Sequence, residues 1–136
     1  MRWRRLLVGL GVAGAMFAVV TLVALEGEEV VQLRTTTPDG AVRVTRTWIA
    51  DAGGASWLEA ATPDRPFLRD VEQRPDVELV RGGSVLTLRA VPVPGDAGHR
   101  TIRRLLAEKY GWADTWIGLL TDTSRSVAVR LDPRTS

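Results

Sequence analysis

The sequence has no cysteine and a single histidine, His99, and these shortages exclude several kinds of site. Without cysteine the chain has no disulfide and no thiolate metal ligand. With only one imidazole, a histidine-based zinc site and a Ser-His-Asp triad are both disfavoured. We therefore expect no metal ion, and we assign no catalytic side chain.

The chain also lacks a concentrated basic patch. It carries 18 Lys and Arg residues against 16 Asp and Glu residues, but Arg2, Arg4 and Arg5 stand at the start, which leaves 15 against 16. No run of basic residues interleaved with aromatic residues occurs. The high pI therefore reflects the basic start, and we expect no nucleic-acid partner.

What the sequence does contain is one long apolar run at residues 6–25, in which Thr21 is the only polar side chain. At a rise of about 1.5 Å per residue, such a helix spans roughly 30 Å, the thickness of a bilayer core. We predict a transmembrane helix at 6–25, a basic cytoplasmic leader at 1–5 and a short acidic linker at 26–29. Because positive charge stays inside, the following domain is expected outside the cell membrane.

A cleaved signal peptide is the competing interpretation, since it shares the basic start and the apolar middle. The run exceeds the roughly 7–15 residues usual for a signal peptide, and no small-x-small cleavage motif ends it. Gly9, Gly11 and Gly14 spell G-x-G-x-x-G. A dinucleotide fingerprint requires a preceding strand, so we interpret these glycines as part of the membrane helix.

Residues 30–136 are enough for one domain. A helix is predicted with Asp64 as its cap, Pro66 in its first turn and Arg74-Pro75 at its end. An amphipathic helix is predicted at 96–110, and its outward face includes Arg100, Arg103 and Arg104. Alternating and β-branched patterns predict six strands, at 30–37, 41–50, 56–61, 77–80, 84–93 and 126–131. The order β-β-β-α-β-β-α-β with short turns predicts a mainly-β (α+β) domain, a small six-stranded barrel with two or three helices.

Two stretches leave alternatives open. Residues 112–120 are rich in Trp and Leu, and they form a helix packed on the barrel or lie against the membrane or a second subunit. Arg46 falls in the same alternation as Val44 and Trp48, on a face that is otherwise apolar. A charge there requires a carboxylate of the domain, a solvated strand edge or an anionic ligand, which guanidinium suits by its planar fork of donors.

Three motifs follow one another along the chain: L-R-T-T-T … R-V-T-R-T-W at 33–48, R-P-D-V-E-L followed by R-G-G at 74–83, and Y-G-W-A-D at 110–114. In this order they resemble the split β-barrel flavoproteins. This group includes the pyridoxamine-phosphate-oxidase-like proteins and the deazaflavin-dependent nitroreductase family. The resemblance covers residues 30–131. The turn Pro38-Asp39-Gly40 replaces that family's glycine- and lysine-bearing loop.

The resemblance implies a split β-barrel that binds FMN or a deazaflavin coenzyme, and a homodimer. In such proteins the first hairpin and the following helix hold the cofactor phosphate and ring. Carried over, Arg65 or Arg69 would be the basic partner of the phosphate. The other cofactor-binding residues implied are Thr35, Thr36, Arg43, Thr45, Arg46 and Thr47.

Two functions follow from these features. The first is a membrane-anchored flavin- or deazaflavin-dependent oxidoreductase of quinone- or nitro-type substrates, in which the cofactor carries the hydride and the protein orients it. The alternative is a non-catalytic, membrane-tethered barrel that binds a small ligand or a partner protein, because a fold does not fix a function.

Overall fold

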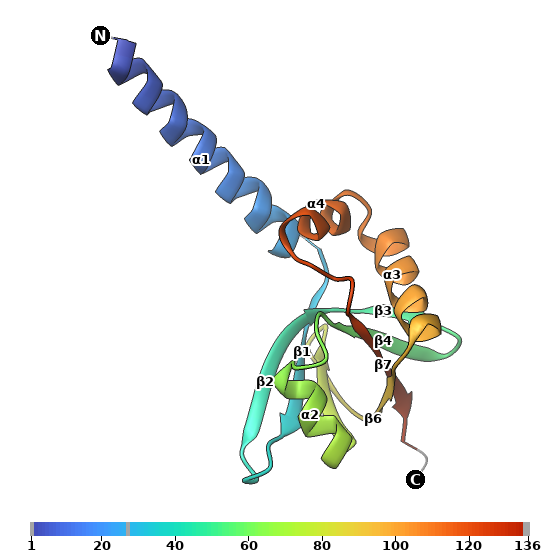
Figure 1. The fold of residues 1–136 in the computed structure, drawn as a ribbon. Coiled ribbons are helices and arrows are strands. Elements are labelled where there is room, and N and C mark those ends of the chain that lie inside the picture. Colours follow the sequence, from blue (N-terminus) through green and yellow to red (C-terminus); the bar gives the residue numbers. More distant parts are fainter. Residues whose placement is uncertain (1, 27, 135–136) are drawn as a thin grey trace.

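A computed structural model describes residues 2–26 and 28–134. A long helix, α1, projects from one end of a β-rich domain (Figure 1). The elements in chain order are α1 (Arg2–Glu26), β1 (Val30–Thr36), β2 (Val42–Trp48), β3 (Ala50–Ala52), β4 (Ala55–Ala60), α2 (Pro66–Gln73), β5 (Asp76–Arg81), β6 (Ser84–Val93), α3 (Asp96–Tyr110), α4 (Trp112–Leu120) and β7 (Val127–Pro133).

Within the described residues, seven strands form one antiparallel sheet in the order β2-β1-β5-β6-β7-β4-β3. The edge strands β2 and β3 are separated along the chain by Ile49 alone. The sheet must therefore curl until its two edges approach each other, which gives a half-barrel (Figure 1). Ile49 is fully buried at this crossing, and its backbone N–H donates to Tyr110 Oη over 3.0 Å.

The predicted six strands and their order were wrong at this crossing. The stretch 41–50 was predicted as one strand, whereas the structure ends β2 at Trp48 and begins a separate strand, β3, at Ala50, two residues of which lie beyond the predicted strand. The stretch 41–50 contains neither glycine nor proline, so no local sequence signal marks the bend at Ile49. The break depends instead on the burial of Ile49 and its contact with α3, which lies far along the chain. The structure also makes residues 112–120 a helix, α4.

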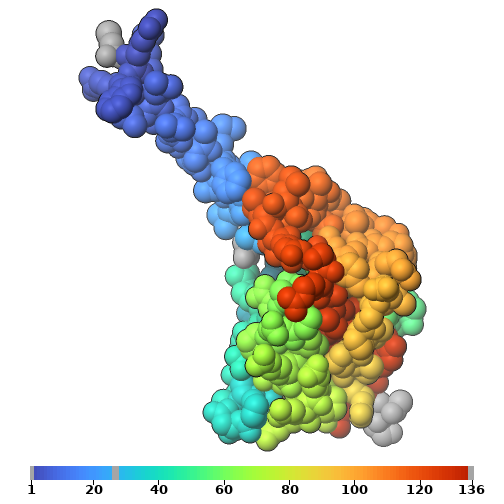
Figure 2. Space-filling view, viewed as in Figure 1, coloured from blue at the N-terminus to red at the C-terminus, as the bar shows by residue number. Residues whose placement is uncertain are grey.

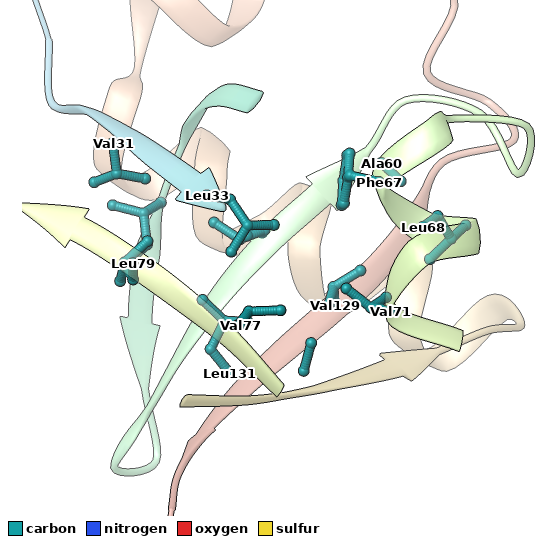
Figure 3. Close-up of a cluster of buried hydrophobic side chains, with 13 residues drawn as sticks. Val31, Leu33, Ala60, Phe67, Leu68, Val71, Val77, Leu79, Val129 and Leu131 are labelled. Atoms are coloured by element: carbon teal, nitrogen blue, oxygen red, sulfur yellow. The ribbon is translucent and has the colours of Figure 1, made fainter. Parts of the chain in front are cut away.

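The interior of the half-barrel is filled by aliphatic side chains from the strands and from α2 (Figure 3). Pro66 occupies the first turn of α2, where its missing N–H costs nothing. Phe67, Leu68 and Val71 then point from this helix into the interior, toward Leu33 and the other strand residues. Arg74 and Pro75 follow the helix and end it.

A second hydrophobic layer lies on the other face of the sheet. Successive residues of a strand point to opposite faces, so Val129 of β7 enters the interior while Ala128 meets the helices. Ile102, Leu106 and Tyr110 of α3 pack in this outer layer. Gly98 lets α3 start close to β6, because a Cβ there would collide with the Val93 carbonyl oxygen.

The last turns of α1 belong to the outer layer as well. Ala24 is fully buried among residues of α3, α4 and β7. Trp116 of α4 donates from Nε1 to Thr21 Oγ1 over 3.0 Å, and its ring lies 5.5 Å from that of Phe17. Residues 2–16 are exposed, and this part of α1 stands away from the domain (Figure 2).

Candidate functional site

A cleft of about 650 Å³ lies among β2, the start of α2, α4 and the end of α1. Its volume falls within the range of roughly 300–1,000 Å³ that is typical of small-molecule sites. Leu25, Val30 and Ile117 give it an apolar wall, whereas β2 gives it arginines and threonines. The cleft is thus amphiphilic, and it is assembled from segments about a hundred residues apart in the chain.

On β2, the side chains of Arg43, Thr45 and Thr47 form the half-buried face. Val42 and Val44 on the opposite face are 67% and 54% exposed. Of the alternatives open for Arg46, an exposed position on an edge strand is the one that the structure shows. β2 is an edge strand, Val42 and Val44 beside Arg46 are exposed, and Arg46 is itself an exposed residue of the cleft wall.

Arg43 is oriented by a buried carboxylate. Its Nε donates to Asp70 Oδ2 over 2.8 Å, and Thr35 Oγ1 donates to the same oxygen over 2.7 Å. Asp70 is only 2% exposed, whereas the Arg43 side chain is 39% exposed and lines the cleft. These contacts join β1 and β2 to α2, and they fix the guanidinium of Arg43 against the cleft.

Arg103 crosslinks the other side of the cleft. Its Nη1 lies 3.0 and 3.1 Å from the two carboxylate oxygens of Glu59, and its Nη2 lies 2.8 Å from both oxygens of Asp114. Burial alone lowers the pKa of Arg103, but the two carboxylates outweigh it and raise the pKa. The group stays charged, and it holds α3, β4 and α4 together. The prediction that Arg103 belongs to a solvated helix face was wrong.

The structure brings together five of the eight predicted binding residues. The cleft lining contains Arg43, Thr45, Arg46, Thr47 and Arg65.

The other three lie elsewhere. Thr35 is 1% exposed and serves Asp70, as described above. Thr36 lines a separate depression of about 230 Å³ together with Asp76 and Glu78. Arg69 is exposed on α2, with Nη2 at 3.9 Å from Asp64. Of the two arginines considered for the phosphate, Arg65 is the one that lines the cleft.

Sequence reasoning missed Glu59, Arg103 and Asp114. One signal was present for Arg103, since it lies three residues before Leu106 and seven before Tyr110, at the border of the apolar stripe of α3. No comparable signal marks Glu59 or Asp114.

Among residues 2–26 and 28–134, no group of three His, Cys, Asp or Glu side chains is placed to hold a metal ion. His99 contacts Ser126, with Nδ1 2.9 Å from Oγ, outside the cleft lining.

The residues present fit an anionic ring compound. Arg43, Arg46 and Arg65 supply cationic donors and Thr45 and Thr47 supply hydroxyls, which is the donor set that a phosphate needs. The apolar wall can cover a flat ring.

Solved structures place this fold among known ones. The fold is similar to Rv2991 from Mycobacterium tuberculosis, with a TM-score of 0.63 and 18% identity over 87% of this chain and 79% of that one. An F420 reductase matches with a TM-score of 0.56 and 23% identity over 84% and 93% of the two chains. A pyridoxamine 5′-phosphate oxidase-like protein from Listeria innocua matches with a TM-score of 0.58 and 15% identity over 84% and 90%.

The chain has a split-barrel fold. The resemblance seen in the hairpin and turn motifs is thereby confirmed for the fold. The sequence matches no family model and no curated protein. At these identities the likeness to solved split barrels shows the fold alone.

Proposed function

We propose that this protein is a membrane-anchored split barrel that binds a flavin or deazaflavin coenzyme in the cleft beside β2 and acts as a reductase. The observation that carries this proposal is the gathering of Arg43, Thr45, Arg46, Thr47 and Arg65 around one cleft with an apolar wall. Quinone- and nitro-type compounds are the substrates to test first. Bound there, the coenzyme supplies the hydride chemistry.

The chain's own part is to bind, orient and exclude water. Arg65 and Arg43 would hold a phosphate group, and the hydroxyls of Thr45 and Thr47 would donate to its oxygens. Ile117 and Val30 would cover the ring and keep water from its reactive face.

A non-catalytic binding barrel is the second candidate, and one contact favours it. The Nε of Arg43 already donates to the buried carboxylate of Asp70. A phosphate would share this guanidinium with a fixed anion, which weakens its attraction for the ligand.

The anchor is α1. Among the described residues, Arg2–Leu25 is the only helix long and apolar enough to cross a membrane, with a mean hydropathy of 2.5. A signal sequence passes the same test, but Ala24 is fully buried in the outer layer and Thr21 accepts a hydrogen bond from Trp116. Cleavage after the apolar run would remove these contacts. This supports a retained anchor, a leader at 1–5, a linker at 26–29 and a domain at 30–136.

Two further features belong to the proposal. The arginines at positions 2, 4 and 5 favour a cytoplasmic N-terminus, with the domain outside. A homodimer is supported by β2, whose edge presents the exposed side chains of Val42 and Val44. Such an edge has unpaired backbone N–H and C=O groups, with which a strand of another chain can pair.

The test is a fluorescence titration of the full chain in detergent micelles with FMN and, separately, with the deazaflavin coenzyme. We expect saturable binding of one of them in the micromolar range. Arg65→Ala should weaken binding about tenfold or more, because a charge-assisted hydrogen bond contributes about 1.5–3 kcal/mol. Arg69→Ala is the matched control, since Arg69 lies on α2 outside the cleft, and it should leave the affinity unchanged.

Arg46→Ala tests the exposed arginine of β2 that lines the cleft. We expect weaker coenzyme binding, and an unchanged affinity would remove Arg46 from the site. If the folded chain binds neither coenzyme, the reductase proposal fails and the non-catalytic barrel replaces it.

A further inference from the structure

The outward face of α4 is mainly apolar although the helix lies at the surface. Trp112, Leu119 and Leu120 lie on this face together with the exposed Thr115 and Gly118, whereas Trp116 is half-buried against α1. Trp112 is 50% exposed, Leu119 78% and Leu120 46%. Asp114 lies on the opposite side of the helix, and it is buried in the domain together with Ala113.

Asp114, the one ionisable residue of α4, does not lie on this outward face. Asp114 is 7% exposed, and both of its carboxylate oxygens accept hydrogen bonds from Arg103 over 2.8 Å. The outward face can therefore enter an apolar phase without carrying an ionised group with it.

The contact between α4 and α1 determines how far from the end of the apolar run 6–25 the helix α4 lies. Trp116 meets Thr21 and Phe17, which lie four and eight residues before the end of the apolar run. At about 1.5 Å per residue, these positions are about 6 Å and about 12 Å inside that end. α4 lies beside the C-terminal end of α1, on the side of the domain from which α1 projects (Figures 1 and 2).

We propose that α4 is an interfacial membrane helix, which lies beside α1 in the boundary between headgroups and acyl chains and inserts Trp112, Leu119 and Leu120 into lipid. The inference rests on α1 being a membrane helix. If 6–25 fills the hydrocarbon core, the Trp116–Thr21 contact lies about 6 Å inside its edge, within the roughly 5–10 Å to which an interfacial helix buries its apolar face. The apolar face of α4 is then continuous with the lipid-facing surface of α1, and the bilayer that receives α1 also receives α4.

This contact orients the whole domain. The domain is already joined to α1 through Ala24 and the Trp116–Thr21 contact, and insertion of α4 into lipid adds a second membrane contact that fixes the orientation of α1 and the domain together. Leu25, Ile117 and Gly118 belong to the cleft lining, so that wall of the cleft is held at the bilayer surface. A ligand with an apolar portion then reaches the cleft from the lipid.

The experiment uses the absence of cysteine, which makes any introduced cysteine a unique labelling site. Leu119→Cys, carrying a nitroxide, is placed in the full chain and reconstituted in phosphatidylcholine vesicles. Electron paramagnetic resonance then compares collisions of the label with oxygen, which concentrates in lipid, and with a water-soluble nickel chelate. Val12→Cys on α1 and Val85→Cys on β6 are the matched controls, since both side chains are exposed, at 54% and 55%.

We expect a several-fold higher ratio of oxygen to nickel collisions at position 119 than at 85, and a ratio at 12 at least as high as at 119. If the label at 12 is in lipid while that at 119 meets the nickel chelate as freely as that at 85, the anchor stands and the interfacial helix is wrong. If position 119 is shielded from both reagents, a second copy of the chain covers α4 and the inference is overturned. If position 12 is itself in water, the anchor fails first and the inference fails with it.

Discussion

The two hydrophobic layers of this protein stabilise different parts of the fold. The inner layer is built from the strands and α2, all within residues 30–131 (Figure 3). The outer layer packs α3 and α4 on the sheet, and it also takes in Ala24 from α1. The inner layer therefore makes the barrel, whereas the outer layer joins the barrel to the helix before it. This difference makes the end of α1 a part of the domain's fold and not only a tether.

Polar contacts also stabilise this joint, by which we mean the region where the end of α1 and Glu29 meet the two edges of the sheet. Tyr110 Oη accepts a hydrogen bond from Ile49 N–H and lies 2.8 Å from the carbonyl oxygen of Glu29, to which it donates. Its ring stacks on Trp48 at a centroid distance of 4.3 Å. Arg81 binds Glu29 on one side and Asp51 on the other, at 2.8 Å and 2.7 Å. Glu29, which follows α1 closely in the chain, is thereby fixed where the two edges of the sheet meet.

The largest effect is expected in the inner layer. Leu33→Ala removes a fully buried side chain and leaves a cavity, which costs about 2–5 kcal/mol of the free energy of unfolding. Urea unfolding of the full chain in detergent measures it. Val85→Ala, at a side chain that is 55% exposed, is the control and should change the free energy by less than about 0.5 kcal/mol. Equal effects at the two sites would contradict the assigned interior.

The next effect is expected at the joint. Tyr110→Phe keeps the ring that stacks on Trp48 but removes the acceptor of the buried Ile49 N–H. An unsatisfied buried donor costs about 1–3 kcal/mol, so we expect about 2 kcal/mol in urea unfolding. Amide hydrogen exchange at Ile49 should become faster in the variant. Unchanged protection of that amide would show that Tyr110 does not hold the crossing.

Local patterns predicted the parts of the fold that local rules govern. The strand predicted at 84–93 and the helix predicted at 96–110 agree with β6 and α3, because glycines and prolines bound them and the helix has a regular apolar stripe. The corner at Ile49 was missed because it has no such signal. It exists only when β2 and β3 become opposite edges of a curled sheet, which is a property of the whole chain.

In the candidate site, likewise, one wall of the cleft was predicted from the sequence and the other was not. The arginines and threonines of β2 were identified from a short motif, but the opposite wall was not. Leu25 and Ile117 meet at the cleft although 92 residues separate them, and only packing of α4 on α1 brings them together. Thr35 shows the converse, since its motif position suggested a ligand while its hydroxyl serves Asp70 inside the barrel.

A smaller effect distinguishes the two parts of α1. Ala24→Leu adds volume to the packed outer layer, and overpacking typically costs about 1–3 kcal/mol. We expect about 1 kcal/mol, because α1 can shift slightly on this one contact. Ala15→Leu makes the same change on the exposed part of α1 and should leave urea unfolding unchanged. If both variants behave alike, the end of α1 is not part of the outer layer.

The smallest effect is an acid dependence of the joint. The hydrogen bonds from Arg81 hold the pKa of Asp51 at about 2, below its ordinary 3.8. Because the folded-state pKa is the lower one, this contribution is fully present above pH 3.8 and is lost as the pH falls toward 2. Asp51 is 53% exposed, so solvent screening limits the effect to below about 1 kcal/mol.

Urea unfolding at a series of pH values measures this contribution. Asp51→Asn should lower the free energy of unfolding at neutral pH and make it fall less steeply between pH 3.8 and about 2. Asp64→Asn is the control, since its carboxylate is 73% exposed and lies 3.9 Å from Arg69, away from the joint. If Asp51→Asn and the unchanged chain lose stability in parallel over this range, Arg81 does not fix β3 to the joint. α1 would then be joined to the domain by the outer layer, by the hydrogen bonds of Tyr110 and Trp116 and by the pair of Arg81 with Glu29.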